Sequence, residues 1–374
     1  MASISEQEAV VIGGGLVGAS IAWGLTRASV QTVVLDGEDL ALRASRANFA
    51  LIWVQGKGVG KPDYARWSQQ AAQNWPQLAS DLLATTGIDV SLSQKGGFSF
   101  ALSDAELQQW HDEAARVARE VGEGAPDYQV LDHAATRAML PAIGPDVVGS
   151  VYSTADGHVN SLRLLRALHT ALLKSGVDYR SHHDVTQITP DKNGFILTGI
   201  WGQMRTRKLI LAAGVNNTML APMVGLHVPL VRSKGQILVT EKCAPFFDYT
   251  AATIRQADEG GVMIGDSEET HSAALMTNQD ISAVLANRAI RIFPHLADVN
   301  IVRSWAGFRV KSKDGMPIYQ QSETCPGAFV VTCHSGVTLA SNHTLIVAPQ
   351  IAAGRLDDNL KPFSARRFHV SVTD

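Results

Sequence analysis

Three glycines near the start of the chain have the spacing Gly-x-Gly-x-x-Gly, at Gly13, Gly15 and Gly18. In a nucleotide site the first allows a tight turn, the second lets the backbone approach a pyrophosphate, and the third lets a helix pack on a strand. Asp36 follows 18 residues after Gly18, where a carboxylate can accept a hydrogen bond from a ribose hydroxyl. The spacing predicts a dinucleotide site, but it does not distinguish NAD from FAD.

The segments around these glycines have the composition that such a site needs. Apolar, β-branched runs predict strands at 8–12 and 32–35, and the residues between them predict a helix at 19–27 whose N-terminus attracts phosphate. The uncharged stretch 9–25 is shorter than a membrane span and is broken by five glycines. Because no Lys or Arg precedes it, it does not have the pattern of a signal peptide either.

Composition excludes several classes of protein. The chain has 374 residues, enough for two or three domains, and 45% of them are hydrophobic, which excludes disorder. Lys and Arg number 32 and Asp and Glu 35, for a formal charge of −3 without a block of like charge. Nucleic acid and anionic membranes are therefore poor candidates for partners.

Cysteine and histidine show no pattern of a metal or disulfide site. Cys243, Cys325 and Cys333 cannot all pair, and none forms a CxxC motif. The 12 histidines are scattered without metal-ligand spacing. We expect no metal, reduced thiols and a cytoplasmic location.

The remaining pattern predicts two kinds of sheet. A hairpin over 194–212 ends in Ala212-Ala213-Gly214, which either approaches the same nucleotide or makes a turn at a domain boundary. Strands without intervening helices over 229–264 favour an antiparallel sheet. A second strand–turn–helix unit spans 328–353. Further helices are expected at 64–87, 104–121, 161–174 and 281–292, and strands at 176–180, 185–188 and 301–305.

The segment Ala44–Ala50 resembles the Ala-Ser-x-x-Asn-x-Gly segment of the D-amino-acid oxidase superfamily of flavoproteins, which passes alongside FAD, except that Ala50 replaces the glycine. Motifs in the family's order extend the resemblance over nearly the whole chain. They are Gly13–Gly18 with Asp36, Asp156–Asn160, Ala212–Gly214, Val231–Gln236, Ile254–Asp258, Gly261–Glu269, Trp305–Arg309, Asp314–Pro317, His334–Leu339 and Phe363–Phe368.

The resemblance implies an α/β fold with a GR2-type, Rossmann-like FAD-binding domain and an interleaved, mostly antiparallel α+β substrate domain. The FAD-binding domain would comprise residues 1–85, 148–222 and 305–374. The substrate domain would comprise residues 86–147 and 223–304.

The resemblance also implies a chemistry, the oxidation of a C–N bond by hydride transfer to the flavin N5. Candidate substrates are a D-amino acid, D-hydroxyproline, an opine or an N-alkyl glycine. The chain is most similar to the glycine oxidase and sarcosine oxidase β-subunit branch, and within it to catalytic β-subunits of heteromeric opine or D-hydroxyproline dehydrogenases. Its electrons would pass to partner subunits, with further FMN or an iron–sulfur cluster in or with them, or to another non-oxygen acceptor.

Other interpretations stay open. One is a self-sufficient oxidase that uses oxygen, and another is a non-catalytic FAD-binding electron-relay subunit. In monomeric sarcosine oxidase a lysine in a Gly-x-Lys-x-Gly segment promotes the reaction with oxygen, and the matching position here is Met263, although Lys57 or His334 could substitute. An NAD-dependent dehydrogenase is disfavoured, because the Asn48 and Ser335–Leu339 motifs have no NAD counterpart.

The resemblance assigns roles to individual residues. Arg309 would bind the substrate carboxylate, and His334 would touch substrate or tune the flavin. Trp53 and Tyr64 would wall the substrate pocket, whereas His158 is expected in the turn before a helix. Because Gly307 stands where sarcosine oxidases attach flavin through cysteine, FAD would be non-covalent. The expected FAD-binding residues are Gly13, Gly15, Leu16, Val17, Gly18, Asp36, Ser45, Asn48, Phe49, Ala50, Leu51, Val185, Ala213, Gly214, Gly307, Ser335, Gly336, Val337, Thr338 and Leu339.

Overall fold

The computed structural model describes residues 6–38, 43–270 and 274–368. Its first sheet has the strand order β19-β20-β11-β1-β2-β8, with β10 and β9 extending it as a hairpin from β11. The strands from β20 to β8 are parallel, while β19 and the hairpin are antiparallel. They are β1 (Glu6–Ile12), β2 (Thr32–Leu35), β8 (Asp178–Arg180), β9 (Gln187–Asp191), β10 (Gly194–Gly199), β11 (Gly202–Leu211), β19 (Ile318–Gln321) and β20 (Ala328–Thr332).

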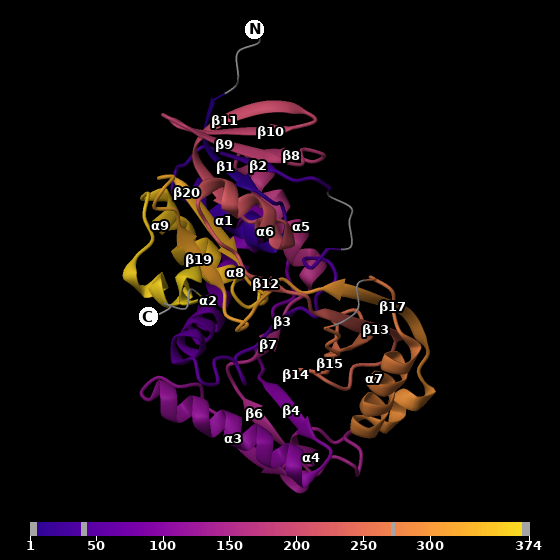
Figure 1. The fold of residues 1–374 in the computed structure, drawn as a ribbon. Helices are drawn as coiled ribbons and strands as arrows, with labels where there is room; N and C mark the ends of the chain where they lie inside the picture. The colour runs from indigo at the N-terminus through magenta and orange to yellow at the C-terminus, as the bar shows by residue number, and fades with distance from the viewer. Residues whose placement is uncertain (1–5, 39–42, 271–273, 369–374) are drawn as a thin grey trace.

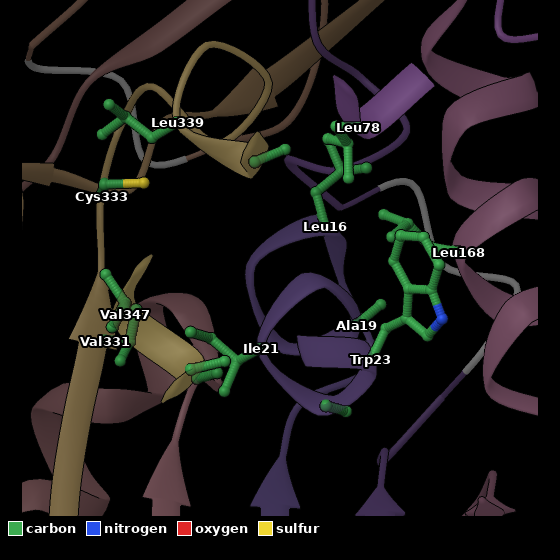
Figure 2. Packing of buried hydrophobic residues seen from close by; sticks show 14 of the residues in the cluster. Leu16, Ala19, Ile21, Trp23, Leu78, Leu168, Val331, Cys333, Leu339 and Val347 are labelled. Atoms are coloured by element: carbon green, nitrogen blue, oxygen red, sulfur yellow. The ribbon is translucent and has the colours of Figure 1, made fainter. Parts of the chain in front are cut away.

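Helix α1 (Leu16–Arg27) forms the centre of the core on one face of this sheet (Figure 2). Ile21 and Trp23 are buried there with Val331 of β20 and Leu168 of α5 (Ser161–Lys174). Burial of one such side chain stabilises the fold by about 1.5–3 kcal/mol. The mixture of small and large residues on α1 thus fixes the helix against the sheet and places its N-terminus at the strand ends.

The second sheet has the order β17-β13-β16-β15-β14-β4-β6-β5 and lies at the opposite end of the molecule (Figure 1). Its pairs are antiparallel except β14 with β4, so it is mostly antiparallel as expected. Its strands are β4 (Gly97–Ala101), β5 (Gln129–Asp132), β6 (Gly149–Ser153), β13 (Lys234–Lys242), β14 (Thr250–Ala251), β15 (Ile254–Gln256), β16 (Gly261–Ile264) and β17 (Ile301–Phe308).

The remaining elements cover and connect the two sheets. Three helices pack against the second sheet: α3 (Asp104–Val121), α4 (His133–Met139) and α7 (Gln279–Ile292). Helix α2 (Pro62–Thr86) lies between α3 and α5 (Figure 1). Two short ladders join distant segments, β3 (Leu51–Ile52) with β7 (Gly157–His158) and β12 (Leu230–Val231) with β18 (Lys311–Ser312). No helix in the described ranges is long and apolar enough to span a bilayer.

At two places the expected domain boundary does not coincide with the point where the chain passes from one sheet to the other. Residues 149–153 were assigned to the FAD-binding domain, but they form β6 between β4 and β5 of the second sheet. Likewise β17 continues to Phe308 in the second sheet, beyond the expected change at 305. The sheet that each segment joins is decided by pairing with strands distant in sequence, which periodicity does not reveal.

The helix expected over 337–353 is interrupted. It comprises α8 (Ala340–Asn342), a π-helical turn His343–Val347 and α9 (Ala348–Ala352). Pro349 has no backbone N–H, and its ring would clash with the carbonyl of Leu345 in a regular helix. The wider π turn before the proline relieves this clash.

Candidate active site

A cavity of about 1000 Å³ lies between the two sheets and is lined by residues from every third of the chain. This volume is at the upper end for small-molecule sites. Of the site residues expected from the sequence, all line the cavity except Gly18 and Leu339. Leu339 is fully buried in the core around α1 (Figure 2), where its side chain serves packing.

The glycine turn at the cavity's first-sheet end is closely packed. Gly13 has φ +111°, and a Cβ on it would overlap the carbonyl oxygen of Ala212. A Cβ on Gly18 would overlap the carbonyl oxygen of Gly13. Ala212–Gly214 therefore lies beside the glycine turn, and Gly18 allows α1 to pack closely against that turn.

Two side chains complete the turn at the start of α1. Asp36 is buried, and its Oδ2 accepts from the Gly14 backbone N–H at 2.6 Å while Arg43 pairs with its Oδ1 at 2.7 Å. The Ser45 hydroxyl accepts from the Leu16 N–H at 2.9 Å. A Cβ on Gly15 would lie 2.6 Å from the same hydroxyl oxygen, so any larger residue here would have to displace the Ser45 side chain.

The segment after Ser45 is shaped by its own side chains. The side-chain NH₂ of Asn48 donates to the Ser45 carbonyl at 2.8 Å, and the side-chain oxygen of Asn48 accepts from the Ala50 N–H at 2.9 Å. Ala50 has φ +66°, a left-handed conformation that favours glycine. The position where the family motif has glycine thus retains the glycine conformation although the residue is alanine.

The turn after β20 also lines the cavity, close to the start of α1, because a Cβ on Gly336 would lie 3.6 Å from the Val17 side chain. Thr338 joins it to β3, because its hydroxyl donates to the Leu51 carbonyl and accepts from the Trp53 N–H, both at 3.2 Å. Ser335 contacts the Tyr64 hydroxyl at 2.8 Å and the Lys57 ammonium. Trp53 and Tyr64 are therefore brought to the same part of the cavity, together with Lys57.

Cys333 and His334 belong to this turn and line the cavity. Burial raises the pKa of the Cys333 thiol to about 12, so the thiol stays neutral and is a poor nucleophile. The His334 imidazole is exposed to the cavity. Desolvation by the surrounding protein, followed by the cations Lys57 and Arg309, lowers the pKa of His334, so the neutral imidazole is favoured.

Arg309 projects into the second-sheet end of the cavity directly after β17. Its Nη2 donates to the Ser267 carbonyl at 2.7 Å and its Nη1 to the Lys234 carbonyl at 3.2 Å. Gly235 makes room for it, since a Cβ there would lie 2.6 Å from Nη2. The guanidinium is thus oriented toward the cavity by hydrogen bonds to neutral oxygens.

A buried carboxylate, to which the motif Asp156–Asn160 assigned no role, binds the backbone just before Lys57. Asp156 is fully buried and accepts from the Val54 N–H at 2.5 Å and from the Gln55 amide at 2.7 Å. Desolvation raises the pKa of Asp156 to about 7. Gln55 itself lines the cavity and accepts from Ser99 at 3.1 Å. No local motif identified this network, because its members are about 100 residues apart in sequence.

Two expected placements differ from the structure. Met263 does not line the cavity, and its sulfur accepts from the buried Arg255 guanidinium at 2.7 Å. His158 lies in strand β7 rather than in a turn, and its Nδ1 is 3.3 Å from Arg255. Arg255 also donates to the Phe49 carbonyl at 3.1 Å. Both side chains therefore serve the contact between the Ala44–Ala50 segment and the second sheet.

Comparison with known proteins agrees with this arrangement. The family model DAO, FAD dependent oxidoreductase, matches residues 8–348. A subunit of opine oxidase from Agrobacterium tumefaciens (strain Ach5) is 58% identical over 364 residues, covering 97% of this chain and 98% of that protein. The corresponding opine oxidase subunit from Rhizobium meliloti is 56% identical over 363 residues, covering 97% and 98%. The crystal structure of glycine oxidase from Geobacillus kaustophilus superimposes with a TM-score of 0.89 at 23% identity, covering 98% and 100% of the two chains.

Proposed function

Because the chain belongs to the DAO family of FAD-dependent oxidoreductases, we propose that it is the FAD-carrying catalytic subunit of an opine-oxidising complex. Its substrate would be an amino acid whose nitrogen carries a carboxyalkyl group, and the bond oxidised would be the C–N bond. The observation that carries this proposal is Arg309, a cation whose hydrogen bonds in the described residues go to neutral oxygens, at the end of a cavity shared with the glycine turn. A carboxylate substrate supplies the anion that this guanidinium lacks.

The residues of the first-sheet end fit FAD. The space above Gly15 would be filled by any Cβ, and the start of α1 offers backbone N–H groups to a pyrophosphate. Asp36 would accept from the ribose, and the turn of Ser335–Thr338, which Thr338 joins to Leu51 and Trp53, would line the same site. When bound, FAD supplies the hydride acceptor for the substrate carbon next to nitrogen.

The chain's own residues would orient the substrate and exclude water. Arg309 would hold the carboxylate, while Trp53 and Tyr64 would cover the substrate from the opposite wall. His334, as a neutral imidazole, can accept a hydrogen bond from the substrate nitrogen without adding charge. Electrons would leave to partner subunits, since both opine oxidase relatives are named as subunits of a larger enzyme.

The test is anaerobic reduction of the purified yellow protein by a panel of opines, D-amino acids, cyclic imino acids and N-alkyl glycines. We expect opines to bleach the flavin absorbance most rapidly. Bleaching by glycine or sarcosine alone would favour an oxidase of the glycine type. A yellow protein that no amine reduces would indicate a non-catalytic relay subunit and would contradict the proposal.

A further inference from the structure

We propose that Asp266 binds the cationic nitrogen of the substrate, next to Arg309, which binds its carboxylate. This inference rests on the proposed function and adds to it the residue that would recognise the charged nitrogen of the amino acid substrate. Asp266 follows β16 and lines the second-sheet end of the cavity.

The backbone holds Asp266 in an unusual conformation. Its φ is +79°, in the left-handed region that non-glycine residues rarely adopt. Gly265 fixes the preceding peptide, because its N–H donates to the Thr253 carbonyl at 2.9 Å and a Cβ on it would lie 3.0 Å from the Phe49 ring. On the other side, the carbonyl of Ser267 is held by Arg309. A residue constrained on both sides directs its side chain into the cavity with little freedom.

The Asp266 carboxylate has no hydrogen bond or ion pair to any residue in the described part of the chain. The other charges near it are compensated. Arg288 pairs with Glu106 at 2.9 Å, and Lys311 pairs with Glu268 at 2.6 Å. Arg309 donates to neutral oxygens and forms no ion pair within the described ranges.

Asp266 and Arg309 are therefore one acidic and one basic group that face the same space without touching each other. Desolvation raises the pKa of Asp266, and the charge of Arg309 acts against this rise. A bound cation beside the carboxylate would favour its ionised form. A simple carboxylate on Arg309 would instead meet the like charge of Asp266.

The experiment compares two ligands of nearly the same shape on the oxidised holoenzyme. Both 2-aminoisobutyrate and pivalate have a quaternary carbon beside the carboxylate, so neither has a hydrogen that could leave as hydride. They differ only in an ammonium group in place of a methyl group. Dissociation constants are read from the shift of the flavin absorbance on titration, which requires no turnover.

We expect wild type to bind 2-aminoisobutyrate at least tenfold more tightly than pivalate, as one charge-assisted hydrogen bond would give. Asp266→Asn should lower this ratio at least tenfold, chiefly by weakening 2-aminoisobutyrate. Asparagine keeps the shape and tolerates the left-handed backbone, and Asp266→Gly provides a second variant suited to that backbone. The control is Asp298→Asn, which removes an exposed carboxylate outside the cavity and should leave the ratio unchanged.

A ratio that stays the same in both Asp266 variants would overturn the inference, as would wild type that binds the two ligands equally. Equal weakening of both ligands would also overturn it, because that result indicates a structural role. These outcomes are distinct from failure of the proposed function, which appears as absence of bleaching by any amine.

Discussion

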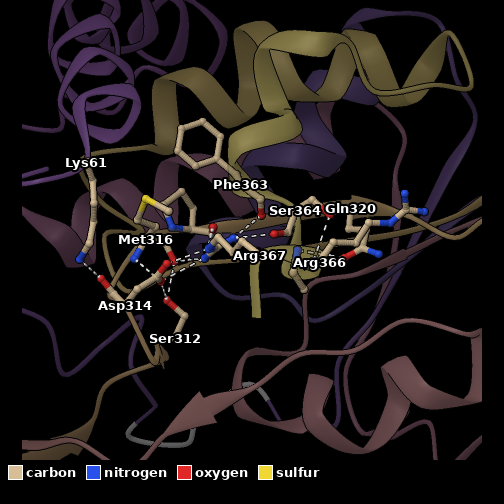
Figure 3. A network of polar contacts seen from close by, with 11 residues as sticks. Lys61, Ser312, Asp314, Met316, Gln320, Phe363, Ser364, Arg366 and Arg367 are labelled. Carbon is tan, nitrogen blue, oxygen red and sulfur yellow. Dashed lines mark hydrogen bonds and ion pairs between the residues drawn. The ribbon is translucent and has the colours of Figure 1, made fainter. Parts of the chain in front are cut away.

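Arg367 binds both carboxylate oxygens of Asp314, with Nε 2.7 Å from Oδ2 and Nη2 3.1 Å from Oδ1 (Figure 3). Arg367 also donates to the Phe363 and Ser364 carbonyls of its own segment. The Asp314 carbonyl accepts from Lys61, at the start of α2. Because Asp314 lines the cavity, this pair joins the C-terminal segment to the cavity wall.

Arg367→Leu should therefore destabilise the protein by about 2–4 kcal/mol, since it leaves a partly buried carboxylate without its partner. Desolvation raises the pKa of Asp314, but the Arg367 and Ser312 hydrogen bonds outweigh it and lower the pKa. The measurement is urea unfolding at pH 7. The matched control is Arg366→Leu, whose pair with Glu323 is largely exposed and should change stability by less than about 0.5 kcal/mol. Equal losses in the two variants would contradict the assignment.

Gly15→Ala should give a folded but colourless protein, because a side chain there meets both the Ser45 hydroxyl and the proposed pyrophosphate. Bound flavin is measured from the visible spectrum, and folding from circular dichroism. Adding Ser45→Ala removes the internal clash, yet we expect the double variant to stay colourless. Stoichiometric FAD in the single variant would show that the pyrophosphate does not lie at this turn.

Arg309→Leu should lower kcat/KM about 30- to 1000-fold, the effect of losing a charge-assisted contact of about 2–4 kcal/mol. FAD should be retained, because Arg309 lies at the second-sheet end of the cavity. The measurement is steady-state kinetics with an artificial dye and the best substrate of the panel. Near-normal efficiency would mean that another cation binds the substrate carboxylate. Lys57, which also lines the cavity, is one such cation.

Asp156 should make stability fall as pH rises. Its pKa is raised by desolvation from 3.8 to about 7, so between these values the folded protein holds a proton that the unfolded chain has lost. Each pH unit in this window then lowers the free energy of unfolding by up to about 1.4 kcal/mol, and the effect ends above about pH 7.

In Asp156→Asn this contribution is absent, so the stability difference between variant and wild type should grow in the variant's favour from pH 5 to 7. The measurement is denaturant unfolding at several pH values, with the exposed Asp248→Asn as control. Parallel curves for Asp156→Asn and wild type would mean that the carboxyl does not titrate in this range.

Reduced flavin should react slowly with oxygen, because Met263 supplies no positive charge and does not reach the cavity. The test is stopped-flow mixing of the anaerobically reduced protein with aerated buffer. Reoxidation as fast as dye-linked turnover would indicate an oxidase. In that case Lys57→Met would show whether the Lys57 ammonium beside Ser335 supplies the charge.

Non-covalent FAD remains a prediction of the sequence, and the structure adds a reason for it. A Cβ at Gly307 would lie 2.9 Å from the Ala47 side chain, so the attachment position leaves little room for a thiol. Cys333 lines the cavity but stays protonated. Acid precipitation should therefore release the flavin into the supernatant, and flavin in the pellet would contradict this expectation.

Features that depend on neighbours in the chain could be predicted from the amino-acid pattern. The turn at Gly13–Gly18, helix α5 and the strand before Cys333 were predictable because glycine spacing and apolar periodicity act over a few residues. The family resemblance extended this to residues far apart, and it led to Arg309, Ser335 and Thr338 at the cavity.

Which side chains line that cavity depends on how distant segments pack together, and no local pattern shows it. Met263 turns toward Arg255, whereas Asp266, three residues later, opens into the cavity because its backbone is left-handed. Asp156 reaches Gln55 across about 100 residues. These contacts follow from strand register and from packing between the two sheets, and both are set by the whole chain rather than by any local pattern.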